Sequence, residues 1–325
     1  MEYAWGIIGP GKIAAKFAAA IRLAGNCTLR AVASRDGDRA RAFAATHGAE
    51  YVYDTYEQLA ADPGIDAIYI ATPHGFHAEH ALLCLRHRKA VLCEKPLALH
   101  AGEVKAMIAA SRDNGAFLME AMWTRFLPIM RETAALIAAG KIGDLKYVRA
   151  DFGFFAPFQP DSRLYNLRLG GGSLLDIGIY PLFLCHYLLG RPDRIVASGH
   201  LSPSGADETA HALLSYSGGR SAVVTSTLAC QTGLTAEIAG AAGSIRIPTP
   251  WYKNDRLSWN RAGQPEEQVL LEPMINGFEY QIREVTDCLE AGRIESPSMP
   301  HTFSLILCET MDEIRRQIGV RYIGE

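Results

Sequence analysis

The sequence predicts an α/β domain with a doubly wound parallel sheet, followed by an α+β domain with a mainly antiparallel sheet. Three observations lead to this prediction. The chain of 325 residues exceeds the usual size of a single hydrophobic core. Its first third alternates short apolar runs with longer helical patterns, whereas residues 194–271 are rich in strands joined by short Gly/Ser turns. We place the domain boundary near Met122, which gives domains of residues 1–121 and 122–325.

Composition and charge narrow the class of protein. Hydrophobic residues make up 49% of the chain and charged residues 21%, as in a soluble, well-packed protein. The formal net charge is −3 with no long basic run, which argues against a nucleic-acid partner. Seven cysteines lie far apart with no C-x-x-C pair, a pattern typical of reduced thiols in a reducing compartment.

Two features of the chain argue against a membrane protein: its N-terminus and its longest apolar stretch. The N-terminus has no basic segment ahead of an apolar one, so a signal peptide is not expected. The longest apolar stretch, residues 174–189, is interrupted by Asp176 and His186 and is too short to span a bilayer. We therefore expect a cytoplasmic protein with no membrane partner.

The first domain is expected to repeat a strand and a helix along the chain. The expected strands are residues 3–8, 28–34, 51–53, 65–71, 90–93 and 116–121, and the expected helices are residues 12–24, 38–46, 76–87 and 102–114. Thr55 and Gln58 form a capping-box pattern that opens a further short helix. The strand at residues 65–71 is almost continuously apolar, as expected when helices cover both faces of the sheet.

The second domain is expected to begin with a helix at residues 127–139 and a long strand at 145–155. A Gly-rich turn and an apolar helix follow at residues 170–189. Further strands are expected at residues 195–201, 210–216, 221–229, 235–239, 244–247 and 268–271, and closing helices at 278–291 and 303–318. Short turns between consecutive strands favour antiparallel pairing.

The turn between the first strand and the first helix carries a G-x-G-x-x-A motif at residues 9–14. Gly9 permits a tight turn, and the missing side chain of Gly11 lets backbone N–H groups approach a pyrophosphate at the helix N-terminus. A glycine motif alone also fits an ordinary strand–helix turn, but its strand–turn–helix setting favours dinucleotide binding. Lys12 and Ile13 complete the cofactor contacts expected in this turn.

The end of the second strand indicates which dinucleotide is bound. An acidic residue there would hold the ribose 2′-hydroxyl of NAD, but the chain reads Ser34-Arg35-Asp36. The guanidinium of Arg35 suits a 2′-phosphate and Ser34 adds a donor, which favours NADP. A shift of one residue would put the Asp36 carboxylate there instead, so NAD stays open. The alternative for Arg35 is a solvated loop charge.

Two loops follow the fourth and fifth strands, at the carboxyl edge of the sheet where cofactors bind. In the first, Thr72 either caps the next helix or contacts the cofactor. His74 and His77 are further candidate contacts of the cofactor, and packing is the alternative for His77.

The second loop, after the fifth strand, reads Glu94-Lys95-Pro96. An ammonium at this place would hydrogen-bond a substrate oxygen and stabilise the charge that develops during hydride transfer. Outside this context, a Lys before a Pro is only a turn.

The Gly-rich segment at residues 170–180 opens the apolar helix. Asp176 and Tyr180 are spaced i and i+4, which places them on one face of an α-helix. A carboxylate in an apolar segment is costly unless it is paired, and Lys95 is a candidate partner. A tyrosine hydroxyl beside a cation can have its pKa lowered enough to exchange a proton, whereas spacing alone favours a core tyrosine.

Together, the glycine turn, Glu94-Lys95-Pro96 and the pattern Gly-Gly-Gly-x-x-x-Asp-x-Gly-x-Tyr resemble the glucose–fructose oxidoreductase/inositol dehydrogenase family over essentially the whole chain. Residues 120–126, 163–166 and 284–316 resemble the branch of the dimeric dihydrodiol dehydrogenases and D-xylose dehydrogenases. Inositol dehydrogenases usually have His where this chain has Tyr180. The resemblance implies a Rossmann domain followed by an open, mainly antiparallel sheet, with homodimers formed through the sheet face.

The resemblance also implies NADP-linked oxidation of a secondary alcohol in a sugar or a cyclic vicinal diol. It places Lys95 and Tyr180 on the catalytic positions, and it implies a cis Lys95–Pro96 bond. Tyr180 would exchange the hydroxyl proton, Lys95 would polarise the oxygen, and Asp176 would hold Lys95; which of the first two is the formal base stays open. No metal is expected. The residues expected around the substrate are Trp123, Arg125, Phe154, Arg163, Asn166 and Trp251. The three aromatic ones also fit core or interface packing.

Two other functions fit the same fold. One is a regulatory protein that binds NADP without turnover, and the other is an NAD-dependent glycosidase that keeps its cofactor and uses transient oxidation. The presence of both Lys95 and Tyr180 favours an enzyme over the regulator. Release of reduced cofactor into solution would separate dehydrogenation from the glycosidase reaction.

Overall fold

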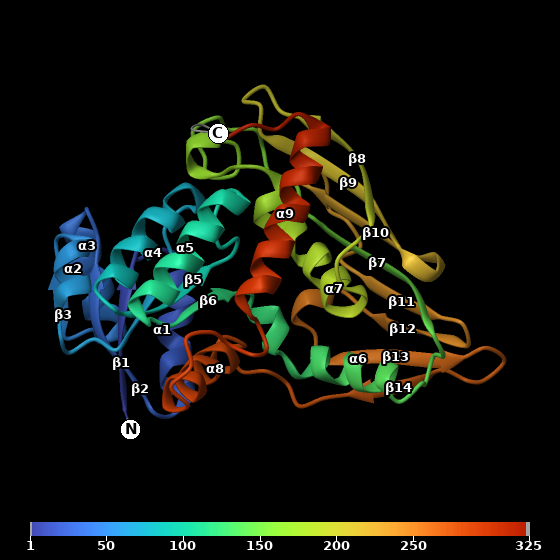
Figure 1. Cartoon of the computed structure of the whole chain (residues 1–325), viewed down its shortest axis with the longest axis horizontal. Helices are drawn as coiled ribbons and strands as arrows, with labels where there is room; N and C mark the ends of the chain where they lie inside the picture. Colours follow the sequence, from blue (N-terminus) through green and yellow to red (C-terminus); the bar gives the residue numbers. More distant parts are fainter. Residues whose placement is uncertain (1, 323–325) are drawn as a thin grey trace. The chain divides into compact units, whose positions relative to one another are not determined.

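The structure is a computed structural model that describes residues 2–322, and the chain divides into two compact units (Figure 1). The first unit comprises residues 2–125 together with Ile275–Cys308, and the second comprises Phe126–Met274 and the residues from Glu309 onward. The break after residue 125 lies close to the expected boundary. Residues 275–308 differ from the expectation, because they pack with the first unit and not with the second.

A parallel sheet with the strand order β3-β2-β1-β4-β5-β6 forms the centre of the first unit. This is the strand order of the dinucleotide-binding fold. Its strands are β1 (Tyr3–Ile8), β2 (Cys27–Ala33), β3 (Tyr51–Tyr53), β4 (Ala67–Ile70), β5 (Ala90–Glu94) and β6 (Leu118–Ala121). Its helices are α1 (Lys12–Ala24), α2 (Gly37–His47), α3 (Tyr56–Ala61), α4 (His77–Arg86), α5 (Ala101–Asn114) and α8 (Glu279–Glu290), with the start of α9 (His301–Ile318).

Aromatic packing joins α1 to the sheet. The ring of Phe17 on α1 stacks on Tyr69 of β4 at 3.7 Å and meets Trp5 of β1 edge-on at 5.3 Å. All three side chains are fully buried. The capping box expected at the start of α3 is confirmed, because Thr55 and Gln58 exchange side-chain and backbone hydrogen bonds.

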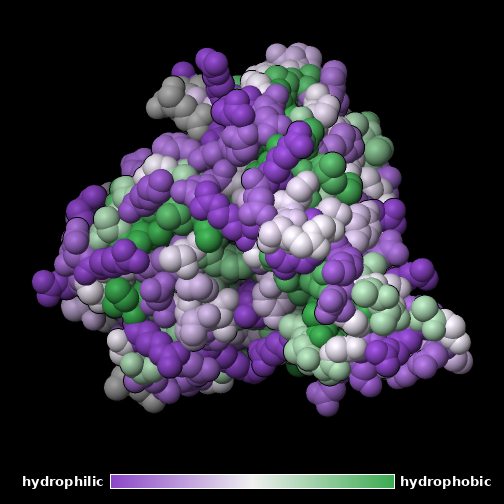
Figure 2. Space-filling view, turned by 45° about the vertical axis from the view of Figure 1, so that its right-hand side comes forward, coloured by the Kyte–Doolittle hydropathy of each residue, from purple (hydrophilic) through white to green (hydrophobic). Residues whose placement is uncertain are grey.

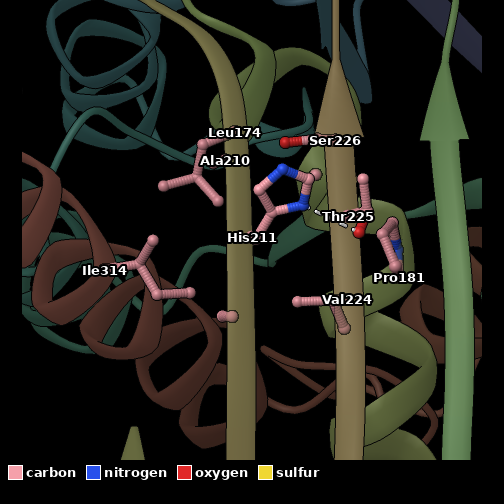
Figure 3. Close-up of a pocket in the computed structure, with 10 residues that line it drawn as sticks. Leu174, Pro181, Ala210, His211, Val224, Thr225, Ser226 and Ile314 are labelled. Carbon is pink, nitrogen blue, oxygen red and sulfur yellow. Dashed lines mark hydrogen bonds between the residues drawn. The ribbon is translucent and has the colours of Figure 1, made fainter. Parts of the chain in front are cut away.

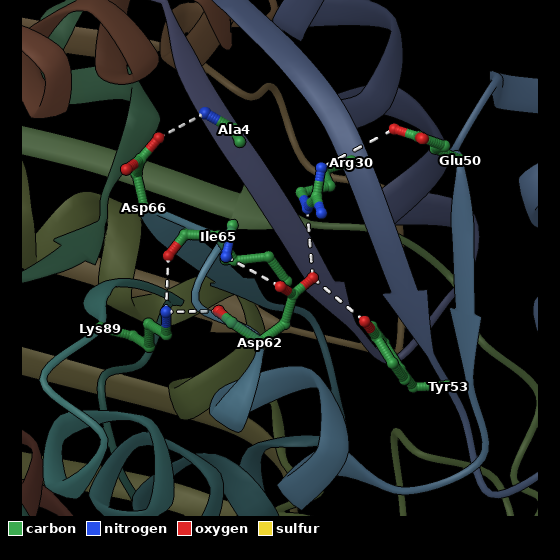
Figure 4. A network of polar contacts seen from close by, with 9 residues as sticks. Ala4, Arg30, Glu50, Tyr53, Asp62, Ile65, Asp66 and Lys89 are labelled. Atoms are coloured by element: carbon green, nitrogen blue, oxygen red, sulfur yellow. Dashed lines mark hydrogen bonds and ion pairs between the residues drawn. The ribbon is translucent and has the colours of Figure 1, made fainter.

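A polar network that includes residues of β2 and β3 fixes the turn between α3 and β4 (Figure 4). The carboxylate of Asp62 accepts hydrogen bonds from Arg30 at 3.2 Å and from the Tyr53 hydroxyl at 3.0 Å, which ties the turn to β2 and β3. The ammonium of Lys89 donates to the carbonyls of Asp62 and Ile65 at 2.6 and 2.7 Å. These bonds add a charged donor to two backbone carbonyls of the turn, and the Asp62 carbonyl also accepts from the N–H of Ile65 at 3.2 Å.

The residues that return to the first unit do so through α8. The side chain of Asn276 donates to the carbonyl of Lys16 at 3.0 Å, and Arg283 donates to the carbonyl of Leu23 at 2.6 Å. Both acceptors lie on α1. The helix α8 therefore closes the first unit from a position more than 250 residues further along the chain.

The second unit is built on a sheet with the strand order β14-β13-β12-β11-β7-β10-β9-β8. The pair of β7 and β10 is parallel and the other pairs are antiparallel, which confirms the mainly antiparallel expectation. The strands are β7 (Leu145–Gly153), β8 (Arg194–Leu201), β9 (Asp207–Tyr216), β10 (Arg220–Thr227), β11 (Ala236–Gly240), β12 (Gly243–Ile247), β13 (Arg256–Arg261) and β14 (Glu267–Leu270). No strand was expected at β13, whose polar and apolar residues alternate without a continuous apolar run.

Helices of the second unit include α6 (Pro128–Ala138), α7 (Ile179–Leu189) and the end of α9. A π-helical turn, Leu174–Gly178, leads directly into α7, so the expected apolar helix begins with a wider turn. Among residues 2–322, one helical stretch, Leu167–Leu189, is long and apolar enough to cross a membrane, and 89% of its most apolar window is buried within the fold. On the face shown in Figure 2, hydrophilic side chains predominate and hydrophobic ones form separate patches.

Candidate active site

The glycine turn after β1 has the geometry that a dinucleotide needs. Gly9 has a φ of +86°, and a Cβ at this position would lie 3.0 Å from the backbone of Ala71 and Thr72, so a larger residue does not fit. A Cβ at Gly11 would meet no protein atom within 4 Å. The space over the N-terminus of α1 is therefore open, and Lys12 and Ile13 are exposed beside it. Backbone N–H groups at such an end bind phosphate oxygens.

The two oppositely charged residues that follow β2, Arg35 and Asp36, have different surroundings. Asp36 caps α2, since its carboxylate accepts a hydrogen bond from the backbone N–H of Arg39 at 3.0 Å. The hydroxyl of buried Ser34 accepts from the N–H of Asp36 at 3.1 Å. Arg35 is exposed, with its guanidinium carbon 5.6 Å from the ring centre of Phe76 in the loop after β4. Arg35 is thus an exposed cation at this corner of the sheet, whereas the exposed Arg39 pairs with Asp36.

Histidines organise the loop after β4. The ring of His77 is fully buried and bridges two loops, with Nδ1 2.8 Å from the Pro96 carbonyl and Nε2 2.8 Å from the Thr72 carbonyl. Burial lowers the pKa of His77 to about 4, although the two carbonyls oppose this shift. Thr72 lies 3.0 Å from Nδ1 of His80 through its hydroxyl, and His74 packs against His77 with ring centres 5.6 Å apart. His77 therefore holds the two loops together from within the core.

Lys95 follows β5 and is half-buried. The Lys95–Pro96 bond is cis, as expected. Behind Lys95, the carboxylate of Glu94 accepts a hydrogen bond from the Tyr69 hydroxyl and another, at 3.2 Å, from the N–H of Lys95. Burial raises the pKa of Glu94, while these bonds and the charge of Lys95 oppose the rise. Glu94 thus supports the lysine from inside the sheet.

A second buried carboxylate, Glu120 at the end of β6, holds the same loop. One of its oxygens accepts a hydrogen bond from the N–H of Leu97 at 2.9 Å. Burial raises the pKa of Glu120 to about 7, against the hydrogen bonds from Ser304 and Leu97. Glu120 was not among the site residues expected from the sequence. The available signal was an acidic residue inside an otherwise apolar strand.

In the second unit, Asp176 lies in the π-helical turn and is paired with Arg163 at 2.9 Å. Burial acts to lower the pKa of Arg163, but the charge and hydrogen bond of Asp176 outweigh it and the pKa is raised, with a contribution from Tyr180. Asp176, Arg163 and Tyr180 therefore form one electrostatic group. The expected contact of Asp176 with Lys95 involves the other unit and stays a prediction.

Tyr180 has an aromatic surround. Its ring centre lies 5.4 Å from that of Phe152 and 5.4 Å from that of Tyr252, and these two rings stack on each other at 4.3 Å. Trp251, expected as a wall of the substrate site, is fully buried, and its indole N–H donates to the Asp151 carbonyl at 2.9 Å. Core packing, the alternative for this residue, describes it correctly. The neighbouring Tyr252, which was not among the expected site residues, contacts Tyr180 together with Phe152.

The other residues expected around the substrate are divided between the two units. In the first, buried Trp123 lies under the Lys16 ammonium at 4.0 Å, and Arg125 donates to the Ser298 carbonyl at 2.9 Å. In the second, Phe154 is half-buried after β7, and Asn166 caps a short turn by accepting from the N–H of Arg168 at 2.9 Å. Among residues 2–322, no group of three or more His, Cys, Asp or Glu side chains is arranged to hold a metal ion.

A dinucleotide-binding unit with an open glycine turn, joined to a unit that presents a tyrosine beside an ion pair, defines an NAD(P)-dependent oxidoreductase. Sequence comparison agrees with this class. Residues 3–122 match the oxidoreductase family with an NAD-binding Rossmann fold, and residues 130–246 match the GFO/IDH/MocA C-terminal domain. The chain belongs to the GFO/IDH/MocA family of oxidoreductases.

Relatives and solved structures extend over nearly the whole chain. Trans-1,2-dihydrobenzene-1,2-diol dehydrogenase of Danio rerio is 41% identical, over 99% of this chain and 98% of its own length. The mouse enzyme of the same name is 36% identical, again over 99% and 98%. Among solved structures, a 3-ketoreductase from Actinomadura kijaniata in complex with NADP is 28% identical with a TM-score of 0.88, over 98% of both chains. An aldose-aldose oxidoreductase from Caulobacter crescentus is 25% identical with a TM-score of 0.89, over 98% of this chain and 97% of that one.

Proposed function

We propose that this protein is an NADP-dependent dehydrogenase that oxidises a secondary alcohol of a cyclic vicinal diol or a sugar. The proposal rests on two polar side chains that could act on a substrate hydroxyl. Lys95 lies at the carboxyl edge of the Rossmann sheet, and Tyr180 lies beside the Arg163–Asp176 ion pair. The relatives named as dihydrodiol dehydrogenases support the diol, and the sugar-acting structural relatives support the sugar.

The cofactor preference rests on the end of β2. Of the two charged residues that follow β2, Asp36 caps α2 with its carboxylate, so Arg35 is the one proposed to contact the ribose of the cofactor. A guanidinium pairs with a 2′-phosphate through charge-assisted hydrogen bonds. NADP is therefore the preferred cofactor in this proposal, and the solved complex of the 3-ketoreductase with NADP supports it.

The residues have separate tasks in the reaction. A nicotinamide cofactor held at the glycine turn of Gly9 and Gly11 would supply the acceptor for the hydride of the carbinol carbon. Tyr180 takes the hydroxyl proton, and Lys95 donates a hydrogen bond to the same oxygen, which becomes the carbonyl oxygen of the ketone. Arg163, paired with Asp176, places a guanidinium in the electrostatic surroundings of Tyr180. Glu94 and Glu120 hold the loop that carries Lys95.

A panel of cyclic diols, aldoses and inositols, each supplied with NADP and read by absorbance of reduced cofactor, tests the proposal. We expect turnover with a vicinal diol or a sugar, release of reduced cofactor into solution, and a higher kcat/KM with NADP than with NAD. Tyr180→Phe serves as the inactive control. Absence of turnover across the panel, while NADP binds, would instead favour the regulatory function. Cleavage of a glycoside without release of reduced cofactor would favour the glycosidase.

The same resemblance supports two wider proposals. We infer that the protein works in the cytoplasm, because its scattered cysteines are typical of reduced thiols.

We also infer a homodimer formed through the face of the second unit's sheet. Val196 on β8 and Leu213 on β9 are cross-strand neighbours, and they are 46% and 45% exposed. Neighbouring exposed apolar side chains are suited to contact with another chain.

A further inference from the structure

A group of buried polar side chains surrounds the start of the π-helical turn that leads to Tyr180. We call it the Asp207 cluster, and it consists of Ser173, Asp207, Ser226, Arg315 and Tyr322. Each of these residues is at most 4% exposed, and all lie in the second unit. None of them is needed as a contact of substrate or cofactor in the proposed reaction.

Asp207 makes the central contacts of the cluster. One carboxylate oxygen accepts hydrogen bonds from the Ser173 hydroxyl and from the N–H of Leu174, both at 2.7 Å. The other oxygen lies against Gly172, where a Cβ would approach it to 2.2 Å. Gly172 has a φ of +131°, a conformation that favours glycine. The turn is therefore built around this carboxylate.

A carboxylate is favourable at a helix N-terminus, but one that is fully buried, as Asp207 is, carries a cost of desolvation. Burial raises the pKa of Asp207 to about 6, while the bonds from Ser173 and Leu174 and the charge of Arg315 act against the rise. A serine or asparagine side chain satisfies a helix N-terminus without burying a charge. Buried polar groups that accept specific hydrogen bonds can instead specify one arrangement among several. We interpret Asp207 in that sense, because the residues it orders lead to Tyr180.

Further contacts fix the turn on both sides. Before the turn, the Tyr322 hydroxyl donates to the Gly171 carbonyl at 2.8 Å. At its end, Gly178 packs so closely on β10 that a Cβ would lie 2.8 Å from the Ser226 hydroxyl oxygen. Ser226 is also 2.9 Å from the Ser173 hydroxyl. In Figure 3, Ser226 and Leu174 lie at the same end of a small cavity between the sheet and the helices.

We propose that Asp207 is a positioning residue for the reaction: it sets the start of the π-helical turn and thereby the places of Asp176 and Tyr180. This inference rests on the proposed function of Tyr180. Asp207 acts through the backbone of residues 173–178, and the wider π turn replaces the i, i+4 alignment of Asp176 and Tyr180 that a regular α-helix would give. The orientation of both side chains consequently depends on how this turn begins.

The test combines kinetics with hydrogen exchange on the full-length enzyme. Asp207→Ala removes the acceptor, whereas Asp207→Asn keeps an acceptor oxygen and removes the charge. Misplacing a reacting group by about 1 Å can cost up to about 100-fold in rate. We expect Asp207→Ala to lower kcat by roughly 10- to 100-fold with little change in the KM for NADP, and Asp207→Asn to restore most of that loss. In a Tyr180→Phe background, Asp207→Ala should lower kcat less than about threefold, because the hydroxyl that Asp207 positions is already absent.

Gln317→Ala is the matched control for lost stability. Gln317 accepts from the N–H of Ala197 at 2.7 Å and donates to the Ile195 carbonyl, so it ties α9 to β8 within the same unit without touching the turn. This variant should lower Tm while keeping kcat. Amides of residues 174–180 should exchange roughly tenfold faster in Asp207→Ala than in the wild type, and at the wild-type rate in the control.

Two results would overturn the inference. One is unchanged exchange of residues 174–180 in Asp207→Ala, and the other is an equal kcat loss from Asp207→Ala with and without Tyr180. Full activity of Tyr180→Phe alone would overturn the proposed function of Tyr180, which is a separate outcome. In that case the exchange measurement still decides whether Asp207 sets the turn.

Discussion

At the end of β2, a single side chain is expected to decide the cofactor. Arg35 is exposed there, while the neighbouring Asp36 is occupied as the cap of α2. The charge of Arg35 also reaches His80, whose pKa is lowered to about 4 by burial and, to a smaller extent, by this guanidinium. The positive charge of Arg35 thus reaches Phe76 in the loop after β4 and His80 on α4, and a 2′-phosphate of the cofactor would balance this charge.

We predict that Arg35→Ala weakens binding of NADP much more than that of NAD. A hydrogen bond to a charged group contributes about 1.5–3 kcal/mol, which corresponds to roughly a 10- to 100-fold increase in Kd. Titration of both cofactors, followed by nicotinamide or protein fluorescence, measures the difference. Arg39→Ala is the matched control, because Arg39 is an exposed arginine one turn further on that pairs with Asp36. An equal loss for the two cofactors would mean that Arg35 is a solvated loop charge.

Individual residues were predictable where the chemistry is local. The glycine turn and Glu94-Lys95-Pro96 depend on neighbours within a few positions, and the structure places them as expected. Trp251 and Tyr252 were not separable, because which of two adjacent aromatic rings faces Tyr180 depends on how β7 packs beneath them. The ion pair of Asp176 with Arg163 was likewise not predicted, because Arg163 lies thirteen residues away across a loop whose course the sequence does not reveal.

The strands β5 and β6 illustrate how one element supports the chemistry of another. Glu120 on β6 pairs in register with Cys93 on β5 and accepts the N–H of Leu97 beyond Lys95. Its carboxyl is buried near Glu94, Lys95 and Ser304, and burial is the main reason that its pKa lies near 7 instead of 4.5. A raised pKa means that the folded protein favours the protonated carboxyl. The stability that this provides is present below about pH 4.5 and is lost as the pH rises through about 7.

Glu120→Gln should therefore flatten part of the pH dependence of stability. The variant keeps an acceptor for Leu97 but cannot ionise, so its free energy of unfolding should gain on that of the wild type between pH 4.5 and 7.5. The expected relative gain is of the order of 1–3 kcal/mol, and urea unfolding at several pH values measures it. Glu103→Gln is the control, since Glu103 accepts the N–H of Leu99 in the same loop while its side chain is 30% exposed. Parallel curves for wild type and Glu120→Gln would contradict the account.

Elements were predictable where hydrophobic periodicity is strong. The alternating strands and helices of the first unit appear as expected, with boundaries that differ by one or two residues. The π-helical turn at Leu174–Gly178 was not expected, because a uniformly apolar segment has no periodicity that distinguishes a wide turn from a regular one. Strand β13 was also missed, because only six residues form it, the buried ones (Leu257, Ser258 and Trp259) include a polar serine, and its neighbours in the sheet supply the pairing.

For the whole molecule, the sheet of the second unit offers a surface for a second copy. Replacing Leu213 by Asp puts a charge beside Val196, and we expect it to convert the proposed homodimer into a monomer, because a charge is costly to bury without a partner. Light scattering should give twice the 35.4 kDa of one chain for the wild type and that single mass for the variant. Leu270→Asp is the control, as Leu270 is 75% exposed on β14 at the other end of the sheet. A wild-type monomer would contradict the dimer proposal.

The division of the chain into units depended on information that a linear pattern does not carry. Residues 275–308 follow the second unit's last strand, and nothing in their composition separates them from it. Their assignment to the first unit comes from contacts such as that of Asn276 with Lys16, which join residues 260 positions apart. The family resemblance, by contrast, was carried by a few motifs spread over the chain and is confirmed by the comparisons.

The central claim is that Lys95 and Tyr180 act on one oxygen, and a double-mutant cycle with a confirmed substrate tests it most directly. Tyr180→Phe should bind NADP normally and lose about 10²–10⁴-fold in kcat, the usual contribution of general acid–base catalysis. Tyr252→Phe, which alters a ring that contacts Tyr180, is the matched control and should keep most of the activity.

Lys95→Ala should be at least as damaging as Tyr180→Phe, because it removes both the polarising charge and a group that favours the ionised tyrosine. The account predicts that the double variant loses much less than the product of the two single losses, since the residues work as one unit. Full activity of Tyr180→Phe, or losses that multiply in the double variant, would contradict it.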